Sequence, residues 1–226
     1  MALTSNLVAY YKLDGNSNDS VGSNNGTDTS VTYSAGNGKI VQGAGLNGSS
    51  SKILLGSNVG AFTDASWAAW IKTTASGNNQ VIADNVSGSG WTFRLLVSSA
   101  KAMFSLVNYG VGGGTNCVGA TSINNGSWHH IVGTRSGGNY VIYVDGASDG
   151  TATGGTTTTT DMPLAFGCEY YGGTGFEFFN GAIDELGVWS RALTSGEVTS
   201  LYNAGAGLQY PFTTAPLGGT LSMMGV

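Results

Sequence analysis

The chain has 226 residues, of which 38 are glycine and 3 are proline, and a formal net charge of −5. Only 9% of its residues are charged, whereas 41% are hydrophobic and 10% aromatic, which excludes a disordered chain. The 8 Lys and Arg residues form no basic patch, so the sequence disfavours nucleic-acid binding. No apolar run approaches the ~20 residues needed to span a bilayer.

Short β-type runs alternate with Gly, Asn and Ser turns along the whole chain, which predicts an antiparallel sandwich or barrel. In chain order these runs are 7–13, 40–46, 51–57, 66–74, 80–85, 91–99, 101–109, the hairpin 128–146, 163–171 and 176–192. The Thr-rich stretch 153–161 fits either a flexible loop or an exposed edge strand.

One helix is expected near the end of the chain. Thr194 and Glu197 have the spacing of a capping box, and Val198, Leu201 and Tyr202 then form one apolar stripe. A helix of about two to three turns is too short to be stable alone, so we expect it to pack on the sandwich.

We predict one domain over residues 1–205 and a tail over 206–226 that is either disordered or docked on a neighbouring molecule, as an assembly segment. The first residues, MALTSNLVAYYKLDG, lack the charged and apolar regions of a signal peptide. Cys117 and Cys168 can form a disulfide, but two free cysteines are the favoured interpretation.

Four motifs occur in order along the chain. They are LVAYYKLDGNSNDSVGSNNGT, SWAAWIKT, WHHIVGTRSGGNYVIYVDG and FNGAIDELGVWSRALTSGEVTSLYN. Together they resemble laminin-G-like domains of the concanavalin A-like lectin/glucanase superfamily, over nearly all of residues 7–205. The resemblance implies an all-β, two-sheet antiparallel jelly roll with adjacent first and last strands. It also implies a mostly non-catalytic module that binds glycans or proteins and often carries calcium.

Catalysis is disfavoured by the spacing of the acidic residues. Retaining glycosidases need two carboxylates about 5–5.5 Å apart, and no Glu here lies in an alternating acidic run. Asp184 and Glu185 are neighbours, so on a regular strand their side chains point to opposite faces. The same alternation separates His129 from His130, which we interpret as structural residues. We therefore predict that the chain is not an enzyme.

A structural Ca²⁺ is the one cofactor that the sequence suggests. The loop DGNSNDSVG supplies Asp14, Asp19 and several other oxygen donors, and pairing of the first and last strands brings Asp14 near Asp184. Two unpaired carboxylates repel each other unless a cation lies between them. We predict calcium bound by Asp14, Asp19 and Asp184, with an Asn/Gly turn held by its own hydrogen bonds as the alternative.

Ligand binding by a lectin-like module needs exposed aromatic faces. The aromatic residues that we expect to contact a ligand lie in or beside loops and are Tyr170, Tyr171, Phe176, Trp91 and Tyr109. The alternative is that these rings face the core of the sandwich. The four remaining tryptophans lie in strand-like runs and are interpreted as core residues.

The favoured function is a non-catalytic recognition module of a bacteriophage particle, a capsid decoration or tail adhesion protein that binds surface glycans or other virion proteins. The chain begins with Met and carries no export signal, which favours the virion. The first alternative is an extracellular, lectin-like bacterial module. The second is a glycan hydrolase on the same fold. Homo-oligomer formation through the tail is a further expectation.

Overall fold

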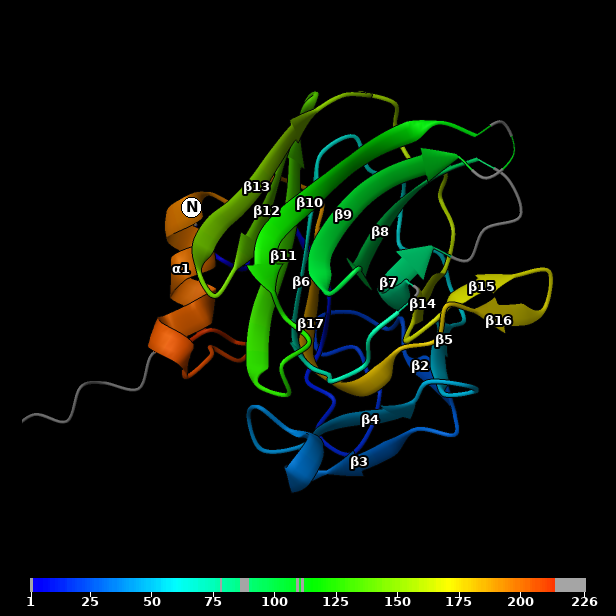
Figure 1. Cartoon of the computed structure of the whole chain (residues 1–226), viewed down its shortest axis with the longest axis vertical. Coiled ribbons are helices and arrows are strands. Elements are labelled where there is room, and N and C mark those ends of the chain that lie inside the picture. Colours follow the sequence, from blue (N-terminus) through cyan, green and yellow to red (C-terminus); the bar gives the residue numbers. More distant parts are fainter. Residues whose placement is uncertain (1, 78, 86–89, 109, 111, 214–226) are drawn as a thin grey trace, which may run out of the picture.

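The computed structural model describes residues 2–77, 79–85, 90–108, 110 and 112–213. These residues form two large antiparallel sheets packed face to face, a small hairpin, and one short helix on the outside (Figure 1). The predicted all-β jelly-roll sandwich with a C-terminal helix is confirmed. Within the described residues, no helix has the length and apolar character needed to cross a membrane.

The first sheet carries the features discussed below. Its strands are β1 (Leu7–Tyr11), β3 (Thr32–Ser34), β4 (Gly43–Asn47), β6 (Ala65–Lys72), β11 (Trp128–Ser136), β12 (Asn139–Val144), β13 (Ala147–Thr153) and β17 (Asn180–Trp189). Their order is β13–β12–β11–β6–β17–β4–β3, and β1 also pairs with β17. The first and last strands are therefore adjacent, as predicted.

The second sheet completes the sandwich. Its strands are β2 (Gly26–Thr29), β5 (Lys52–Leu55), β7 (Gln80–Asn85), β8 (Trp91–Ser98), β9 (Lys101–Asn108), β10 (Gly114–Ser122) and β14 (Leu164–Phe166), in the order β10–β9–β8–β7–β14–β5–β2. The strands β15 (Glu169–Tyr171) and β16 (Thr174–Phe176) form the projecting hairpin (Figure 1). The helical segments are η1 (Ala35–Asn37), α1 (Ser195–Tyr202) and η2 (Asn203–Gly205).

Strand alternation divides the buried residues into two clusters. The larger one fills the space between the sheets and includes Trp67, Ile71, Ile131 and Ile183. The smaller one lies on the outer face of the first sheet, where α1 packs. Its buried members are Tyr10, Ala68, Val132, Tyr143, Trp189, Leu193, Val198 and Leu201. The first sheet is thus covered on both faces where the helix lies, which explains its nearly continuous apolar runs.

The described part of the predicted tail packs on this same outer face. Tyr210 and Phe212 pack against the smaller cluster, and the Phe212 ring lies edge-on to that of Tyr10, with centroids 5.2 Å apart. Gln209 reaches further in and donates hydrogen bonds to two carboxylates. Residues 206–213 are therefore held by the chain's own domain, and residues 214–226 lie outside the described part.

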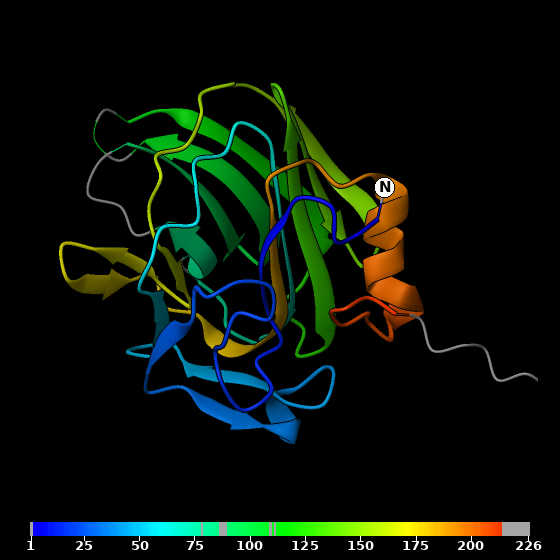
Figure 2. The same ribbon diagram turned by 180° about the vertical axis from the view of Figure 1, so that it is seen from behind.

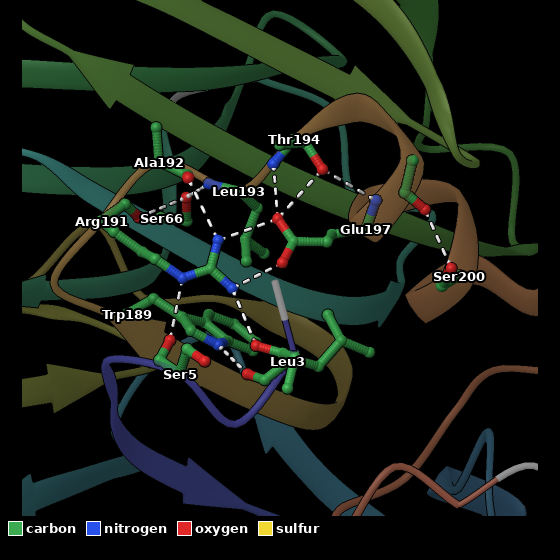
Figure 3. Close-up of polar contacts among 12 residues, drawn as sticks. Leu3, Ser5, Ser66, Trp189, Arg191, Ala192, Leu193, Thr194, Glu197 and Ser200 are labelled. Carbon is green, nitrogen blue, oxygen red and sulfur yellow. Dashed lines mark hydrogen bonds and ion pairs between the residues drawn. The ribbon is translucent and has the colours of Figure 1, made fainter.

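The start of α1 is fixed by a polar cluster that also holds the N-terminal segment (Figure 3). Arg191 makes two parallel bonds to the Glu197 carboxylate, at 2.8 and 2.7 Å, and donates to the carbonyl oxygen of Ser5 at 2.8 Å. The predicted capping box between Thr194 and Glu197 is present. Figure 2 shows the N-terminal segment beside the helix. These contacts join the two ends of the domain.

Several strands lack a clear signal in the sequence. The segments β2, β3, β10 and β13 are rich in Gly, Thr, Ser and Asn, and their outer side chains are exposed. These segments become strands because they pair with more hydrophobic neighbouring strands. Their own composition therefore gives only a weak strand signal. In the Thr-rich stretch 153–161, only Thr153 belongs to a strand. Cys117 and Cys168 are both free and buried, which agrees with the favoured interpretation.

Candidate ligand-binding site

One row of side chains crosses the uncovered end of the first sheet. Backbone pairing aligns Thr32 with Gly45, Gly45 with Ala182, Ala182 with Lys72, and Lys72 with Trp128. The row therefore crosses five adjacent strands, β3, β4, β17, β6 and β11. Four strand spacings of about 4.8 Å give it a length of about 19 Å.

This row faces outward. The residues before Lys72 and after Ala182, Ile71 and Ile183, belong to the core between the sheets, and successive strand side chains alternate between faces. The two central positions, Gly45 and Ala182, have almost no side chain. Larger side chains flank them on both sides, so the row forms a trough rather than a ridge.

The trough is an open pocket of about 540 Å³. Its lining consists of hydroxyl, amide and backbone groups with one lysine: Ser30, Thr32, Asn37, Gly45, Leu46, Asn47, Lys72, Thr73, Thr74, Gly126, Asn180, Gly181 and Ala182. A β-carbon on Gly45 would lie 2.7 Å from the Thr32 hydroxyl oxygen and would also collide with the Asn37 amide. The absence of a side chain at Gly45 therefore lets the Thr32 and Asn37 side chains lie directly over the backbone at this point of the trough.

Lys72 and Trp128 form one wall beside the trough. The Lys72 ammonium lies 5.2 Å from the centroid of the half-buried Trp128 ring and donates to the Gly36 carbonyl oxygen at 3.2 Å. Both contacts hold the lysine side chain across the sheet surface. A partly exposed indole face beside hydroxyl and amide groups is an arrangement that can stack on a sugar ring and bond its hydroxyls.

Asn180 lies where the trough meets the end of the sandwich. Its backbone N–H donates to Gln80 at 3.1 Å, and its carbonyl oxygen accepts from the Thr73 hydroxyl at 2.6 Å. Its side chain is exposed, and within the described residues the side-chain amide makes no hydrogen bond. The backbone of Asn180 is thus fixed, whereas its amide is available to a ligand.

Three of the aromatic residues expected to bind a ligand do lie together, on the β15–β16 hairpin. Tyr171 and Phe176 are 49% and 47% exposed, and the Lys52 ammonium lies 5.9 Å from the Tyr170 ring centroid. The hairpin is attached at both ends, because Arg94 forms ion pairs with Glu169, its first residue, and with Glu177, which directly follows it. Its aromatic rings therefore form a second candidate surface beside the trough.

The other two expected ligand residues do not join them. Trp91 is the first residue of β8, and its side chain packs against the larger core cluster. Tyr109 lies outside the described residues. The sequence also placed Trp128 in the core, which the structure corrects. Ile131 points into the core, and Trp128 is three residues earlier on the same strand, so strand alternation places Trp128 on the outer face. This pattern in the sequence could have identified Trp128 as an outer residue.

Asp184 and Glu185 do not alternate as a regular strand requires. The pairing of β17 with β6 shifts between Asp184 and Gly187, and Glu185 has a φ of 51°. Ile183 and Leu186 both point into the core, so this bulge turns both carboxylates to the outer face. The expectation that they face opposite sides was wrong, because backbone periodicity fails at a bulge.

Both carboxylates are closed off from solvent. Asp184 is 0% and Glu185 3% exposed. Glu185 accepts from the Tyr10 hydroxyl at 2.5 Å and from the Gln209 amide at 2.6 Å. Burial raises the pKa of Asp184 to about 7 and that of Glu185 to about 8, and the neighbouring carboxylates add to both shifts. No substrate can reach this pair while residues 206–213 cover it.

The three carboxylates predicted to hold calcium accept hydrogen bonds instead. Asp184 accepts from the backbone of Lys39 and Ile40, at 2.8 and 2.9 Å, and Asp14 from Gln42 at 2.9 Å. Asp14 does lie near Asp184, since its charge contributes to the raised pKa of that residue.

Asp19 serves its own loop and accepts from the N–H groups of Tyr10, Val21 and Asn24. Among the described residues, no three His, Cys, Asp or Glu side chains are arranged to hold a metal ion. The calcium site at Asp14, Asp19 and Asp184 stays a prediction, and the hydrogen bonds within the loop match the alternative for Asp19.

The histidines are structural. His129 bonds Asp145 and Asn125 through its two ring nitrogens, at 2.8 and 3.1 Å. His130 is buried beside Trp70, and burial lowers its pKa to about 4, so it is neutral at neutral pH.

Comparison with known proteins identifies the family. A model of the concanavalin A-like lectin/glucanases superfamily matches residues 47–199. The chain belongs to this superfamily. The match confirms the resemblance seen in the sequence motifs, and it includes the whole of β6, β11 and β17, three of the five strands that form the trough.

Individual relatives of the superfamily are more distant. Domain 4 of AbnA, an extracellular GH43 arabinanase from Geobacillus stearothermophilus solved with arabinotriose, has 23% identity and a TM-score of 0.70, covering 85% of this chain and 96% of that one. The binding domain of Paraclostridial Mosquitocidal Protein 1 has 18% identity and a TM-score of 0.71, covering 89% and 52%. These likenesses show the fold alone.

A curated relative is the sushi, von Willebrand factor type A, EGF and pentraxin domain-containing protein 1 of Rattus norvegicus. It is 36% identical over 96 residues, which is 38% of this chain and 3% of that protein. The chain thus spans only a small part of the curated relative it matches.

Proposed function

We propose that the chain is a non-catalytic glycan-binding module whose ligand lies in the trough. The observation that carries this proposal is the row of Gly45 and Ala182 between a polar wall and the Lys72–Trp128 wall. It brings small residues, an aromatic face and several hydrogen-bonding groups together in one place. The arabinotriose complex of the structurally similar arabinanase domain supports a sugar as the ligand class.

The absence of catalysis is part of the proposal. The two adjacent carboxylates are buried and lie under residues 206–213, away from the trough lining. The description of the similar domain of Paraclostridial Mosquitocidal Protein 1 as a binding domain also favours recognition over chemistry. Release of reducing ends from a polysaccharide panel would contradict this part.

Fewer observations support a particular biological setting for this module. The virion role, on a capsid or tail, stays a prediction supported by the charge-poor surface, which suits dense assembly beside other virion proteins. The similarity to a domain of an extracellular arabinanase favours the extracellular alternative. Calcium binding also stays a prediction; among the described residues, no group of three His, Cys, Asp or Glu side chains marks its site.

The test is a glycan array followed by calorimetry with wild type, Trp128→Ala and Tyr171→Ala. Loss of a central aromatic contact costs about 2 kcal/mol in typical interfaces, so Trp128→Ala should weaken binding roughly 30-fold. Tyr171→Ala on the hairpin is the matched aromatic control and should weaken binding less. An array without any bound glycan would contradict the proposal.

A further inference from the structure

Two further hollows lie next to the trough, one after the other. A second hollow of about 360 Å³ shares Asn180 with it and is lined by Gly48, Ala75, Ser76, Asn79, Gln80, Glu177, Phe178 and Asn180. A third, of about 440 Å³, shares Asn79 and Glu177 with the second and also includes Gly77 and Ser99. The three neighbouring hollows, each sharing lining residues with the next, are together called the end groove.

The end groove leads from the Trp128 wall toward the aromatic hairpin. Glu177 directly follows the exposed Phe176 of β16, and the segment from β16 to β17 runs between the hairpin and the first sheet (Figure 1). The backbone here is fixed, because the Val81 N–H donates to the Glu177 carbonyl oxygen at 2.9 Å and Arg94 holds the carboxylate. The path is therefore preformed.

The chemistry along the end groove is that of amides and hydroxyls. Its two charged side chains already have partners: Lys72 bonds the Gly36 carbonyl and lies over Trp128, and Glu177 pairs with Arg94 and accepts from the Asn79 amide at 2.9 Å. The net charge of −5 also opposes a polyanion. These groups match the neutral hydroxyls of a sugar chain.

We infer that the end groove binds a neutral, linear oligosaccharide along its length, from the trough across Asn180 to the hollows beside Asn79 and Glu177. This inference rests on the proposed function and adds ligand length and charge to it. A module that recognised a single terminal sugar would need only the trough. The extra hollows instead give each additional sugar unit further polar contacts.

The test is calorimetry with arabino-, xylo- and cello-oligosaccharides of one to six units, and with hexagalacturonate as an acidic probe. In at least one neutral series, we expect affinity to rise at least tenfold from the monosaccharide to the longest member. We expect hexagalacturonate to bind more weakly than any bound neutral hexamer.

Three variants locate the effect. One polar contact contributes about 1 kcal/mol, so Asn79→Ala, in the outer hollows, should weaken the hexamer roughly fivefold and leave the disaccharide unchanged. Asn180→Ala, at the junction, should weaken both. Asn18→Ala is the matched control, because Asn18 is an exposed loop asparagine that does not line the end groove. It should weaken the binding of neither ligand.

The outcomes separate the two proposals. Equal affinity for one and six units, or no effect of Asn79→Ala on the hexamer, overturns the inference and leaves the glycan-binding proposal standing. Tighter binding of hexagalacturonate overturns the neutral ligand class. If no series binds and the glycan array is also empty, both proposals fall.

Discussion

The cluster that anchors α1 should make stability depend on acid in a defined way. The Glu197 carboxylate accepts two bonds from Arg191 and one from the Thr194 N–H at 2.8 Å, and its side chain is 8% exposed. The Arg191 bonds are the largest cause that lowers the pKa of Glu197 from 4.5 to about 2. Because the folded-state value is depressed, the stabilisation is present above pH 4.5 and is lost as pH falls towards 2.

The magnitude follows from that difference. A change from 4.5 to about 2 corresponds to at most about 3 kcal/mol. Glu197→Gln keeps part of the hydrogen bonding, so we expect a loss of about 2 kcal/mol in the free energy of unfolding at pH 7. In a domain of this size, that lowers Tm by about 4–8 °C. By pH 3 the ionic stabilisation of wild type falls below half its value at pH 7, so the difference between the two proteins should shrink.

Urea unfolding of wild type and Glu197→Gln at pH 7 and pH 3 measures this directly. Ser200→Ala is the matched control on the exposed side of α1, where the hydroxyl bonds only Gly196 within the described residues. It should change stability little, and equally at both pH values. A loss in Glu197→Gln that is the same at pH 7 and pH 3 would refute the assignment of the stabilisation to this ion pair.

Three further changes test other parts of the structure. Wild-type Tm should fall as pH rises from about 4 to about 8 and level off above, because the pKa values of Asp184 and Glu185 are raised from 3.8 to about 7 and from 4.5 to about 8; Glu185→Gln should reduce this fall, and an unchanged profile would contradict it. Gly45→Val should displace the Thr32 and Asn37 side chains that line the trough and weaken glycan binding in calorimetry while the circular dichroism spectrum is kept; unchanged affinity would place the ligand elsewhere. EDTA should lower Tm by several degrees if the predicted calcium binds at Asp14, Asp19 and Asp184; an unchanged Tm would contradict calcium and leave these oxygens to their N–H donors alone.

Much of the fold follows from local patterns. The capping box of Thr194 and Glu197 and the apolar runs of β6, β11 and β17 predict the helix and the central strands, because each signal lies within a few residues. The polar strands escaped prediction because only their pairing partners make them strands.

The candidate site was predicted less well. The sequence selected aromatic loop residues, and the hairpin ring pair of Tyr171 and Phe176 is indeed exposed. The trough depends instead on the register of five strands that are distant in sequence, and its floor is marked only by the small residues Gly45 and Ala182. The bulge that turns Glu185 outward likewise has no local sequence signature, since it is set by pairing with β6.

The most direct test of the central claim is to map a bound sugar by NMR. Titration of the ¹⁵N-labelled protein with arabinotriose, or with a glycan selected on the array, should shift the Trp128 indole N–H and the Asn180 side-chain amide first. The Trp67 and Trp189 indoles, which are buried, should stay unchanged. Shifts confined to the β15–β16 hairpin, with Trp128 and Asn180 unaffected at saturation, would contradict a trough-bound ligand.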